Sequence, residues 1–519
     1  MNGAQALIRT LVGAGVDVCF TNPGTSEMHF VAALDDVPEM RAVLGLFEGV
    51  VTGAADGYGR MAGRPAATLL HLGPGLANGL ANLHNARRAH TPVVNVVGDH
   101  ATYHQTYDAP LQSDIASLAR PVSAWYREAA SATSLAADGA DAVAAARATP
   151  GGVATLVVPA DMSWSEAGAP APARPVPTAA SVAGGTVEQL AKVLRAGDGP
   201  VVVLIGGAVM TDRGQVAASR VAAAVGGRLL CETFPARQQR GAGLPAVERL
   251  AYLAELAALQ LEGARHLVVA GTTSPVSFFA YPDKPSDLVP DGCEVHVLAD
   301  RSDDVVGALE ALAEVLGAGS DPVARQAASR PALPSGTLDA QSAGLAIGAL
   351  LPEGAVVADE ANTSGIFVPG ATAGAAPHDW LCLTGGAIGM GLPLATGAAV
   401  ACPDRKVLCL EADGSALYTL QALWTQARLG LDVTTVIFNN RSYAILAMEL
   451  GRVGAGDPGP RALEMLDLSS PPIDFVALAR SMGVPATRAT TAEEFSDQLG
   501  RALAEPGPAL VEAVVGRAI

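Results

Sequence analysis

KVLCLEADGS (residues 406–415) and VTTVIFNN (residues 433–440) are apolar runs that each end in polar residues, and a helix-like stretch, residues 418–428, joins them. This order predicts a βαβ unit, whose right-handed crossover makes the two strands parallel. Parallel strands bring their carboxyl ends to one edge of the sheet, where open α/β sheets bind their ligands. We therefore expect Asp413 and Asn440 to lie close together at that edge.

Asp413 and Asn440 offer oxygen donors of the kind that magnesium prefers. A carboxylate and an amide oxygen are hard ligands and suit Mg²⁺, whose near-octahedral shell is completed by waters and phosphate oxygens. Either fragment alone is explained better as an ordinary turn, because Asp-Gly and Asn-Asn are common turn sequences. Together, at this spacing, they favour a site for a magnesium-bound diphosphate.

The pattern resembles the signature of thiamine diphosphate (ThDP) enzymes, G-D-G-S followed about two dozen residues later by N-N, with Ala412 in place of the first glycine. The resemblance implies that Asp413 and Asn440 ligate Mg²⁺ and that Ser442 adds a main-chain carbonyl. Ala412 departs from the pattern and would crowd the approach of the backbone to the phosphates. The resemblance also implies a wider set of cofactor-binding residues, namely Gly386, Ile388, Met390, Gly414, Ser415, Tyr443 and Ala444.

The chain has 519 residues, which is too long for a single core and suggests about three domains. Linkers rich in proline and alanine at residues 167–177 and 321–336 separate segments in which helix-like and strand-like runs alternate. We expect an α/β protein with three doubly wound parallel sheets. With the domain names used for the ThDP enzymes that the sequence resembles, these are a pyrimidine-binding domain (1–166), a central Rossmann-like domain (182–322) and a diphosphate-binding domain (337–519).

The first and third segments finish alike, with a Pro-Gly turn and a strand-like run at residues 149–159 and 505–515, which suggests a duplicated domain. The middle segment has a Rossmann-like order of strands but lacks G-x-G-x-x-G after the run at 200–207. A structural domain without a nucleotide is the favoured interpretation. Because members of the resembling family bind FAD or ADP here, FAD stays open as a less favoured cofactor.

Composition narrows the partners and the compartment. With 51 acidic and 33 basic residues and no cluster of lysine or arginine, nucleic acid and anionic membranes are unsuitable partners. The six cysteines form no C-x-x-C pair, which argues against a zinc site and fits a reducing compartment. The first residues lack the pattern of a signal peptide, so we expect a cytoplasmic protein. Residues 380–403 are uncharged, but five glycines and Pro393 favour buried backbone around a ligand over a membrane helix.

Glu48 stands in a small, apolar, helix-like run, residues 44–55. An ionised carboxylate there is costly without a partner, although a surface glutamate that begins a helix would explain the residue equally well. In the resembling family, a glutamate in this context hydrogen-bonds the pyrimidine ring of the cofactor and promotes loss of the proton at thiazolium C2. Burial raises the pKa of such a group and lets it exchange protons near neutral pH.

Thr25 and His71 are the candidates for contact with the substrate. Thr25, in TNPGTSE (residues 21–27), resembles the turn in which benzoylformate decarboxylase places a serine against the substrate carboxylate; an ordinary turn hydroxyl is the alternative. His71, in TLLHLGPG (residues 68–75), matches a catalytic histidine of the same enzyme and is a candidate for proton transfer, with a plain strand-end histidine as the other interpretation. That enzyme's second histidine has no counterpart in residues 276–282.

Gln112 and Ile388 match other motifs of the family. Gln112, followed by Arg120-Pro121, keeps the spacing of acetolactate synthases and would face the thiazolium and an acceptor; an exposed loop glutamine is the alternative. Ile388, in GGAIGMGLP (residues 385–393), resembles the bulky residue that wedges between the two cofactor rings; generic core packing is the alternative. The tryptophan that discriminates between acceptors in acetolactate synthases is missing from residues 444–449.

The sequence is therefore identified as a member of the ThDP-dependent superfamily that includes acetolactate synthases and benzoylformate decarboxylases. The leading hypothesis is Mg²⁺-dependent decarboxylation of a pyruvate-like 2-oxo acid with transfer of the remaining unit to a second carbonyl. A simple 2-oxo acid decarboxylase, a non-catalytic regulator that binds ThDP or a nucleotide, and an NAD-dependent oxidoreductase are the alternatives; the last would need a glycine fingerprint that the chain lacks. The resemblance implies a homodimer or homotetramer with active sites at a subunit interface.

Overall fold

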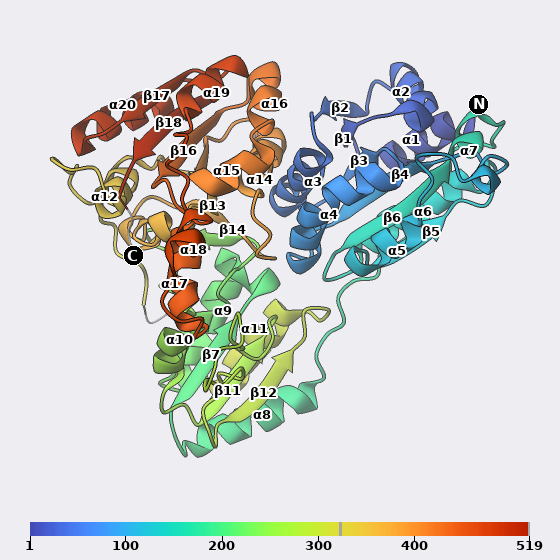
Figure 1. Cartoon of the computed structure of the whole chain (residues 1–519). Helices are drawn as coiled ribbons and strands as arrows, with labels where there is room; N and C mark the ends of the chain where they lie inside the picture. The colour runs from blue at the N-terminus through green and yellow to red at the C-terminus, as the bar shows by residue number, and fades with distance from the viewer. Residues whose placement is uncertain (321–323, 517–519) are drawn as a thin grey trace.

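The computed structural model describes residues 1–320 and 324–516 and contains, within them, three sheets of six, five and seven strands (Figure 1). Each sheet buries alternate residues in two apolar clusters, one on each face, as expected of doubly wound sheets with helices on both sides. The α/β fold with mostly parallel sheets that we expected is confirmed.

The first sheet is parallel throughout and has the order β2-β1-β3-β4-β6-β5. Its strands are β1 (Val18–Asn22), β2 (Arg41–Leu44), β3 (Ala66–Leu70), β4 (Val93–Asp99), β5 (Trp125–Glu128) and β6 (Val153–Pro159). The helices packed on it include α1 (Gly3–Gly13), α3 (Glu48–Ala62), α4 (Leu72–Arg88) and α6 (Leu135–Arg147).

The third sheet has the order β17-β18-β16-β15-β13-β14-β9. Its strands are β13 (Val356–Glu360), β14 (His378–Cys382), β15 (Val407–Ala412), β16 (Val433–Asn439), β17 (Ala486–Ala489) and β18 (Ala509–Val514), with the antiparallel β9 (Gln238–Arg240) at the edge. From β14 to β17 this order repeats that of the first sheet, strand for strand, which supports the suggested duplication. Helices of this part are α12 (Ala340–Leu350), α14 (Gly391–Ala401), α15 (Asp413–Thr419), α16 (Ala422–Leu429), α17 (Ala444–Arg452) and α20 (Ala492–Ala504).

The central sheet is parallel, with the order β10-β8-β7-β11-β12. Its strands are β7 (Val201–Ile205), β8 (Arg228–Cys231), β10 (Glu248–Arg249), β11 (His266–Ala270) and β12 (Glu294–Ala299), flanked by α8 (Gly184–Ala196), α9 (Asp212–Ala224), α10 (Ala254–Leu261) and α11 (Val305–Leu316). β9 belongs to this middle part of the chain yet pairs with β14 of the third sheet, a link that the sequence did not indicate. The domain boundaries given above stay a prediction.

Helices α3 and α14 join the first and third sheets through one continuous apolar cluster. A Cβ added at Gly57 would overlap the carbonyl oxygen of Leu394, and one at Gly397 would overlap that of Ala54, so glycine permits the close approach of the two helices. The uncharged stretch after Trp380 forms β14, a loop and the buried α14. No helix among the described residues is long and apolar enough to cross a membrane.

Candidate active site

Asp413 and Asn440 follow directly after β15 and β16, which pair in parallel, so both residues lie at one sheet edge as predicted. Oδ2 of Asp413 accepts a hydrogen bond from the backbone amide of Arg441 at 2.6 Å. Oδ1 of Asn440 accepts one from the amide of Ser442 at 2.9 Å, and its Nδ2 donates to Oγ of Ser364 at 3.2 Å. The loop of residues 440–442 therefore lies against the Asp413 carboxylate.

The Asp413 carboxylate has the environment of a cation ligand. Its residue is only 2% exposed, and its oxygens accept hydrogen bonds from the backbone amides of Gly414 and Arg441. Burial, only partly offset by these bonds, raises the pKa of Asp413 to about 6. A cation beside this carboxylate would remove the cost of its burial, so the residues present fit Mg²⁺.

Gly414, Tyr443 and Ala444 pack together beside this loop. A Cβ at Gly414 would overlap the ring of Tyr443, which caps the start of α17 at the buried Ala444. Arg441 adopts a left-handed backbone conformation with φ of 58°, which is uncommon outside glycine and is often found at functional sites. Ser415 is buried and accepts a hydrogen bond from Nδ2 of Asn362 at 3.1 Å.

Two buried carboxyl groups, those of Glu360 and Glu411, lie next to the glycine-rich loop before α14. Glu360 accepts hydrogen bonds from the amides of Gly389 at 2.8 Å and Gly391 at 2.5 Å. It stands in register with Glu411 on the neighbouring strand, and both residues are at most 2% exposed. Burial raises both pKa values, that of Glu360 to about 7, so the pair retains a proton near neutral pH.

Gly386, Ile388 and Met390 occupy different surroundings in this loop. Gly386 is exposed with φ of 73°, Ile388 is half-buried and Met390 is fully buried. The thioether of Met390 faces Arg60 of α3, at 3.7 Å from Nη2, so its side chain belongs to the packing between the two sheets. Backbone atoms of Met390 and the half-buried side chain of Ile388 are thus the parts available to a ligand.

Glu48 is the first residue of α3 and is 7% exposed. Nδ2 of Asn78, on α4, donates a hydrogen bond to its Oε2 at 3.0 Å. A Cβ at Gly75 would approach Oε1 to 3.1 Å, so the glycine leaves room beside the carboxylate. Glu48 therefore begins a helix, as one interpretation of the sequence had it, and is buried with a hydrogen-bond partner, as the other had it.

His71 and Glu27 form a hydrogen-bonded pair at the carboxyl edge of the first sheet. Nδ1 of His71 lies 2.8 Å from Oε2 of Glu27, which also accepts a hydrogen bond from the amide of Gly24 at 2.8 Å. The histidine side chain is 22% exposed and that of Glu27 is 1% exposed. Burial raises the pKa of Glu27, although His71 opposes this shift. Thr25 lies in the same turn and is exposed.

Gln112 is half-buried in the loop before α5 (Ile115–Ala119). Its Oε1 is buried and has no hydrogen-bond partner among the described residues, and its backbone amide is bonded to the carbonyl of Ala109 at 2.8 Å. A buried carbonyl oxygen without a donor is uncommon in proteins. This observation favours a role in contact with a ligand over that of an exposed loop residue.

Four residues of the site were missed from the sequence: Glu27, Asn78, Glu360 and Glu411. Glu360 and Glu411 each end an apolar strand-like run, 356–360 and 407–411, so the argument applied to Glu48 would have found them. Asn78 gave no comparable signal. The structure groups the predicted residues in two clusters: Glu48, His71 and Thr25 around the first sheet, and Asp413, Asn440, Ser442 and Ile388 around the third.

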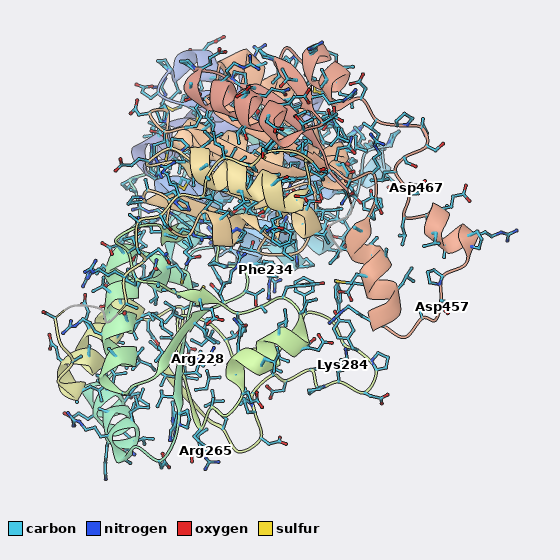
Figure 2. The ribbon with its side chains drawn as sticks, turned by 90° about the vertical axis from the view of Figure 1, so that its left-hand side faces the viewer. Arg228, Phe234, Arg265, Lys284, Asp457 and Asp467 are labelled. Carbon is cyan, nitrogen blue, oxygen red and sulfur yellow. The ribbon has the colours of Figure 1, made fainter. Side chains whose placement is uncertain are left out.

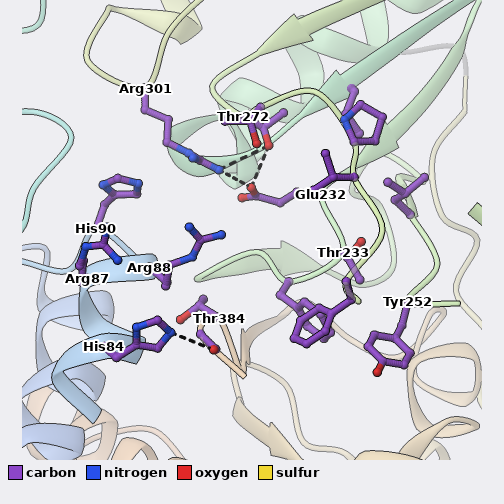
Figure 3. A pocket seen from close by; sticks show the side chains of 18 of the residues that line it. His84, Arg87, Arg88, His90, Glu232, Thr233, Tyr252, Thr272, Arg301 and Thr384 are labelled. Atoms are coloured by element: carbon purple, nitrogen blue, oxygen red, sulfur yellow. Dashed lines mark hydrogen bonds and ion pairs between the residues drawn. The ribbon is translucent and has the colours of Figure 1, made fainter. Parts of the chain in front are cut away.

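A cavity of about 600 Å³ lies where the central sheet meets the other two parts of the chain (Figure 3). Its lining includes Arg87, Arg88 and Arg301 as well as the aromatic rings of Tyr252 and Phe278. Glu232, after β8, accepts hydrogen bonds from the amide of Gly207 at 3.0 Å and from Arg301 at 2.7 Å. The Glu232 carboxylate therefore already accepts the hydrogen bond of an amide in the glycine turn after β7. In a Rossmann-like domain, a phosphate would bind at this position.

Comparison with known proteins identifies the class to which this site belongs. Residues 1–119 match the model described as "Thiamine pyrophosphate enzyme, N-terminal TPP binding domain", and residues 371–513 match "Thiamine pyrophosphate enzyme, C-terminal TPP binding domain". The chain belongs to the thiamine pyrophosphate enzymes. It contains both ThDP-binding domains of that family.

Individual relatives cover nearly the whole chain. It is 63% identical over 517 residues (99% of each protein) to "Putative acetolactate synthase large subunit IlvX" of Mycobacterium tuberculosis. It is 32% identical over 529 residues (96% of each) to benzoylformate decarboxylase of Pseudomonas aeruginosa. Among solved structures, the 4-hydroxybenzoylformate decarboxylase of Rhodococcus jostii RHA1 matches with a TM-score of 0.86 and 27% identity over 99% of both chains.

Proposed function

We propose that this ThDP enzyme decarboxylates a 2-oxo acid and then protonates the carbon that has lost CO₂. The pairing of His71 with the buried Glu27 carries this proposal, because a histidine held by a carboxylate is a suitable proton donor near neutral pH. ThDP, when bound, would supply the electron sink for decarboxylation. The sequence favoured transfer to a second carbonyl; the His71–Glu27 contact favours protonation.

The residues of the third sheet would bind the diphosphate through Mg²⁺. Asp413 and Asn440 would supply side-chain oxygens and Ser442 its carbonyl, with Gly414 and Ser415 next to the phosphates. The buried Asp413 carboxylate supports this assignment. Glu360 would keep the glycine loop in place for cofactor binding through its bonds to two loop amides.

The residues of the first sheet would handle protons and substrate. Glu48 would hydrogen-bond the pyrimidine ring and promote loss of the C2 proton, with Asn78 orienting its carboxylate. The exposed hydroxyl of Thr25 would receive the substrate carboxylate. His71, with Glu27 fixing its ring, would then donate the proton that completes the aldehyde product.

Transfer to a second carbonyl, as in acetolactate synthases, is the second candidate. The half-buried Gln112 supports it, since its side-chain amide could donate a hydrogen bond to the carbonyl oxygen of an acceptor. Residues 276–282 support it too, because this segment contains no histidine to correspond to the second active-site histidine of benzoylformate decarboxylase. The name of the relative in M. tuberculosis points in the same direction.

We further propose that two copies of the chain complete each active site, in a homodimer or homotetramer. Glu48 and Asp413 belong to clusters on different sheets, and the contacts of Glu48 described above lie within its own part of the chain. FAD remains less favoured, because Glu232 already takes up the Gly207 amide at the expected phosphate position.

Product analysis tests the main proposal. The enzyme, saturated with ThDP and Mg²⁺, is incubated with pyruvate and with benzoylformate, and the products are separated by chromatography. We expect aldehyde as the dominant product, with the faster turnover on the aromatic substrate. Predominant acetolactate from pyruvate would instead establish the second candidate, and lack of CO₂ release from any 2-oxo acid tested would contradict both.

A further inference from the structure

The amino ends of β11 and β12 place two histidines and a glutamate on one edge of the central sheet. His266 and Glu294 are the first residues of these strands and stand in register, and His296 is two residues further along β12. This edge lies opposite the one that faces the cavity of Figure 3. Figure 2 shows Arg265, the residue before His266, at the end of the central domain that is remote from the rest of the chain.

The three side chains converge through their polar atoms. Nδ1 of His266 lies 3.0 Å from Nε2 of His296, and this Nε2 lies 3.8 Å from Oε2 of Glu294. One donor atom from each residue falls within 4.8 Å of the other two. His266 is buried, His296 is half-buried and Glu294 is exposed, so the group opens to solvent on one side.

Asp198 holds His266 from the other side of its ring. Its Oδ1 is hydrogen-bonded to Nε2 of His266, and in the tautomer with the proton on Nε2 the lone pair of Nδ1 faces His296. A carboxylate on the far nitrogen is the usual companion of a metal-binding histidine.

The spacing suits a metal bound by imidazole. With metal–nitrogen bonds of about 2.0–2.1 Å in a tetrahedral shell, two ligand nitrogens stand roughly 3.3 Å apart. The two histidines would separate by a few tenths of an ångström to admit an ion, and the exposed Glu294 has the freedom to close from 3.8 Å. Without an ion, a hydrogen bond from His296 to His266 accounts for the same contact.

We propose that His266, His296 and Glu294 bind one transition-metal ion of the zinc class, with Asp198 orienting His266 and water completing the shell. Two imidazoles and one carboxylate select such ions over Mg²⁺, which prefers oxygen ligands throughout. The site is therefore separate, in place and in chemistry, from the magnesium site expected at Asp413. It does not depend on the reaction that the enzyme catalyses.

The bound ion would join β11 to β12 and, through the bond from His266 to Asp198, would also secure the loop before β7. The loop already lies close to β11, because Gly199 lets it pack against the stem of Arg265, where a Cβ would overlap the side chain. The amide of Arg265 donates to the carbonyl of Pro200 at 2.8 Å. An ion that binds only the folded site would raise the temperature at which the protein unfolds.

Calorimetric titration with Zn²⁺ tests the proposal. The protein is first freed of metals with a chelator, dialysed, and saturated with ThDP and Mg²⁺ so that the expected magnesium site is filled. We expect one Zn²⁺ per chain, an affinity for Zn²⁺ at least about tenfold lower in His296→Asn, and a loss of about 10–100-fold in Asp198→Asn. Substitution with Co²⁺ should give the visible absorption of a tetrahedral complex in the wild-type protein only.

Matched variants distinguish this site from general binding to surface groups. His29→Asn removes an exposed histidine of the first domain and should leave Zn²⁺ affinity unchanged. Because the Glu294 side chain is exposed, Glu294→Gln should leave the fold intact. This variant should also bind Zn²⁺ more weakly than the wild type. The proposal is overturned if the wild-type protein takes up no Zn²⁺, or if His296→Asn and Glu294→Gln both bind it with wild-type affinity and stoichiometry.

Discussion

Oε2 of Glu27 lies 2.8 Å from Nδ1 of His71 and is thus the group that fixes the orientation of this half-exposed ring. The amide of Gly24 donates to the same oxygen, and a Cβ at Gly24 would overlap the imidazole. Leu72, directly after the histidine, has φ of 49°, a conformation that is rare for a bulky residue. The turn after β1 and the end of β3 therefore position His71 together.

His71→Ala should slow formation of aldehyde by at least about a hundredfold, because a positioned acid contributes on this scale. Exchange of the C2 proton of bound ThDP should stay at its wild-type rate, since that step is assigned to Glu48. Glu27→Gln should lower the rate in the same direction by about tenfold or more. Stopped assays with a coupled aldehyde dehydrogenase measure the first effect. An unchanged rate in His71→Ala would assign the proton donor elsewhere.

Glu48→Gln should retain the fold and most of the affinity for ThDP while slowing C2 proton exchange at least about a hundredfold. A glutamine keeps the size of the side chain and the contact with Asn78 but removes the carboxylate that promotes proton loss. Deuterium exchange at C2, followed by NMR after acid quench, measures the rate. Exchange at the wild-type rate would reduce Glu48 to a residue that only begins α3.

Asp413→Ala and Asn440→Ala should each weaken ThDP binding in the presence of Mg²⁺ by at least about tenfold, because each removes an oxygen ligand of the bridging ion. Calorimetry with ThDP and Mg²⁺ gives the affinities. Asp404→Ala, which alters an exposed carboxylate close in sequence, is the control. Equal affinities in all four proteins would remove the metal assignment.

The cofactor-free protein should lose stability as the pH rises from about 4.5 to about 7. Glu360 keeps its proton up to about pH 7, and burial also raises the pKa of Glu411 well above its ordinary value, whereas the unfolded chain releases both protons near pH 4.5. In this window the folded state therefore binds more protons than the unfolded state, and the free energy of unfolding falls with pH.

Glu411→Gln tests this linkage, since it removes one titrating group and the repulsion on Glu360. Urea unfolding at pH 5 and pH 7.5 should show a smaller decrease in stability for the variant than for the wild type, by on the order of 1 kcal/mol or more. Glu39→Gln, an exposed site, should behave like the wild type. Parallel pH dependence in all three proteins would mean that Glu411 does not titrate as described.

Periodicity and spacing were sufficient to predict the parallel sheets and the meeting of Asp413 with Asn440, because both depend on local strand signals and on the handedness of the crossover. The pairing of β9 with β14 could not be predicted, since a three-residue strand in a distant part of the chain carries no periodic signal. The role of the five glycines after Trp380 was anticipated only in part. Their contacts with Ala54 and Glu360 depend on tertiary packing.

The partners of the site residues were harder to predict than the residues themselves. Glu48 and His71 were found from their surroundings in sequence, but Glu27, 44 residues before His71, was not. Contacts between separate βα loops leave no pattern along the chain, because the sheet order brings β1 and β3 together only after folding. The pairing of Glu360 with Glu411 could not be predicted for the same reason: β13 and β15 become neighbours only in the folded sheet, although each glutamate ends an apolar run.

Gln112→Ala distinguishes the two possible outcomes after decarboxylation, which are protonation to an aldehyde and transfer to a second carbonyl. If the side-chain amide of the half-buried Gln112 donates a hydrogen bond to an acceptor carbonyl, the variant should make less of any carboligation product while aldehyde formation stays within about twofold of wild type. We expect this result in assays with pyruvate plus an added aldehyde acceptor, with the ratio of ligated product to aldehyde measured by gas chromatography. His71→Ala, which leaves Gln112 intact, should shift the ratio toward the ligated product. Without the proton donor, the bound substrate unit can react only with the acceptor carbonyl. Equal ratios in both variants and the wild type would show that neither residue controls this partition.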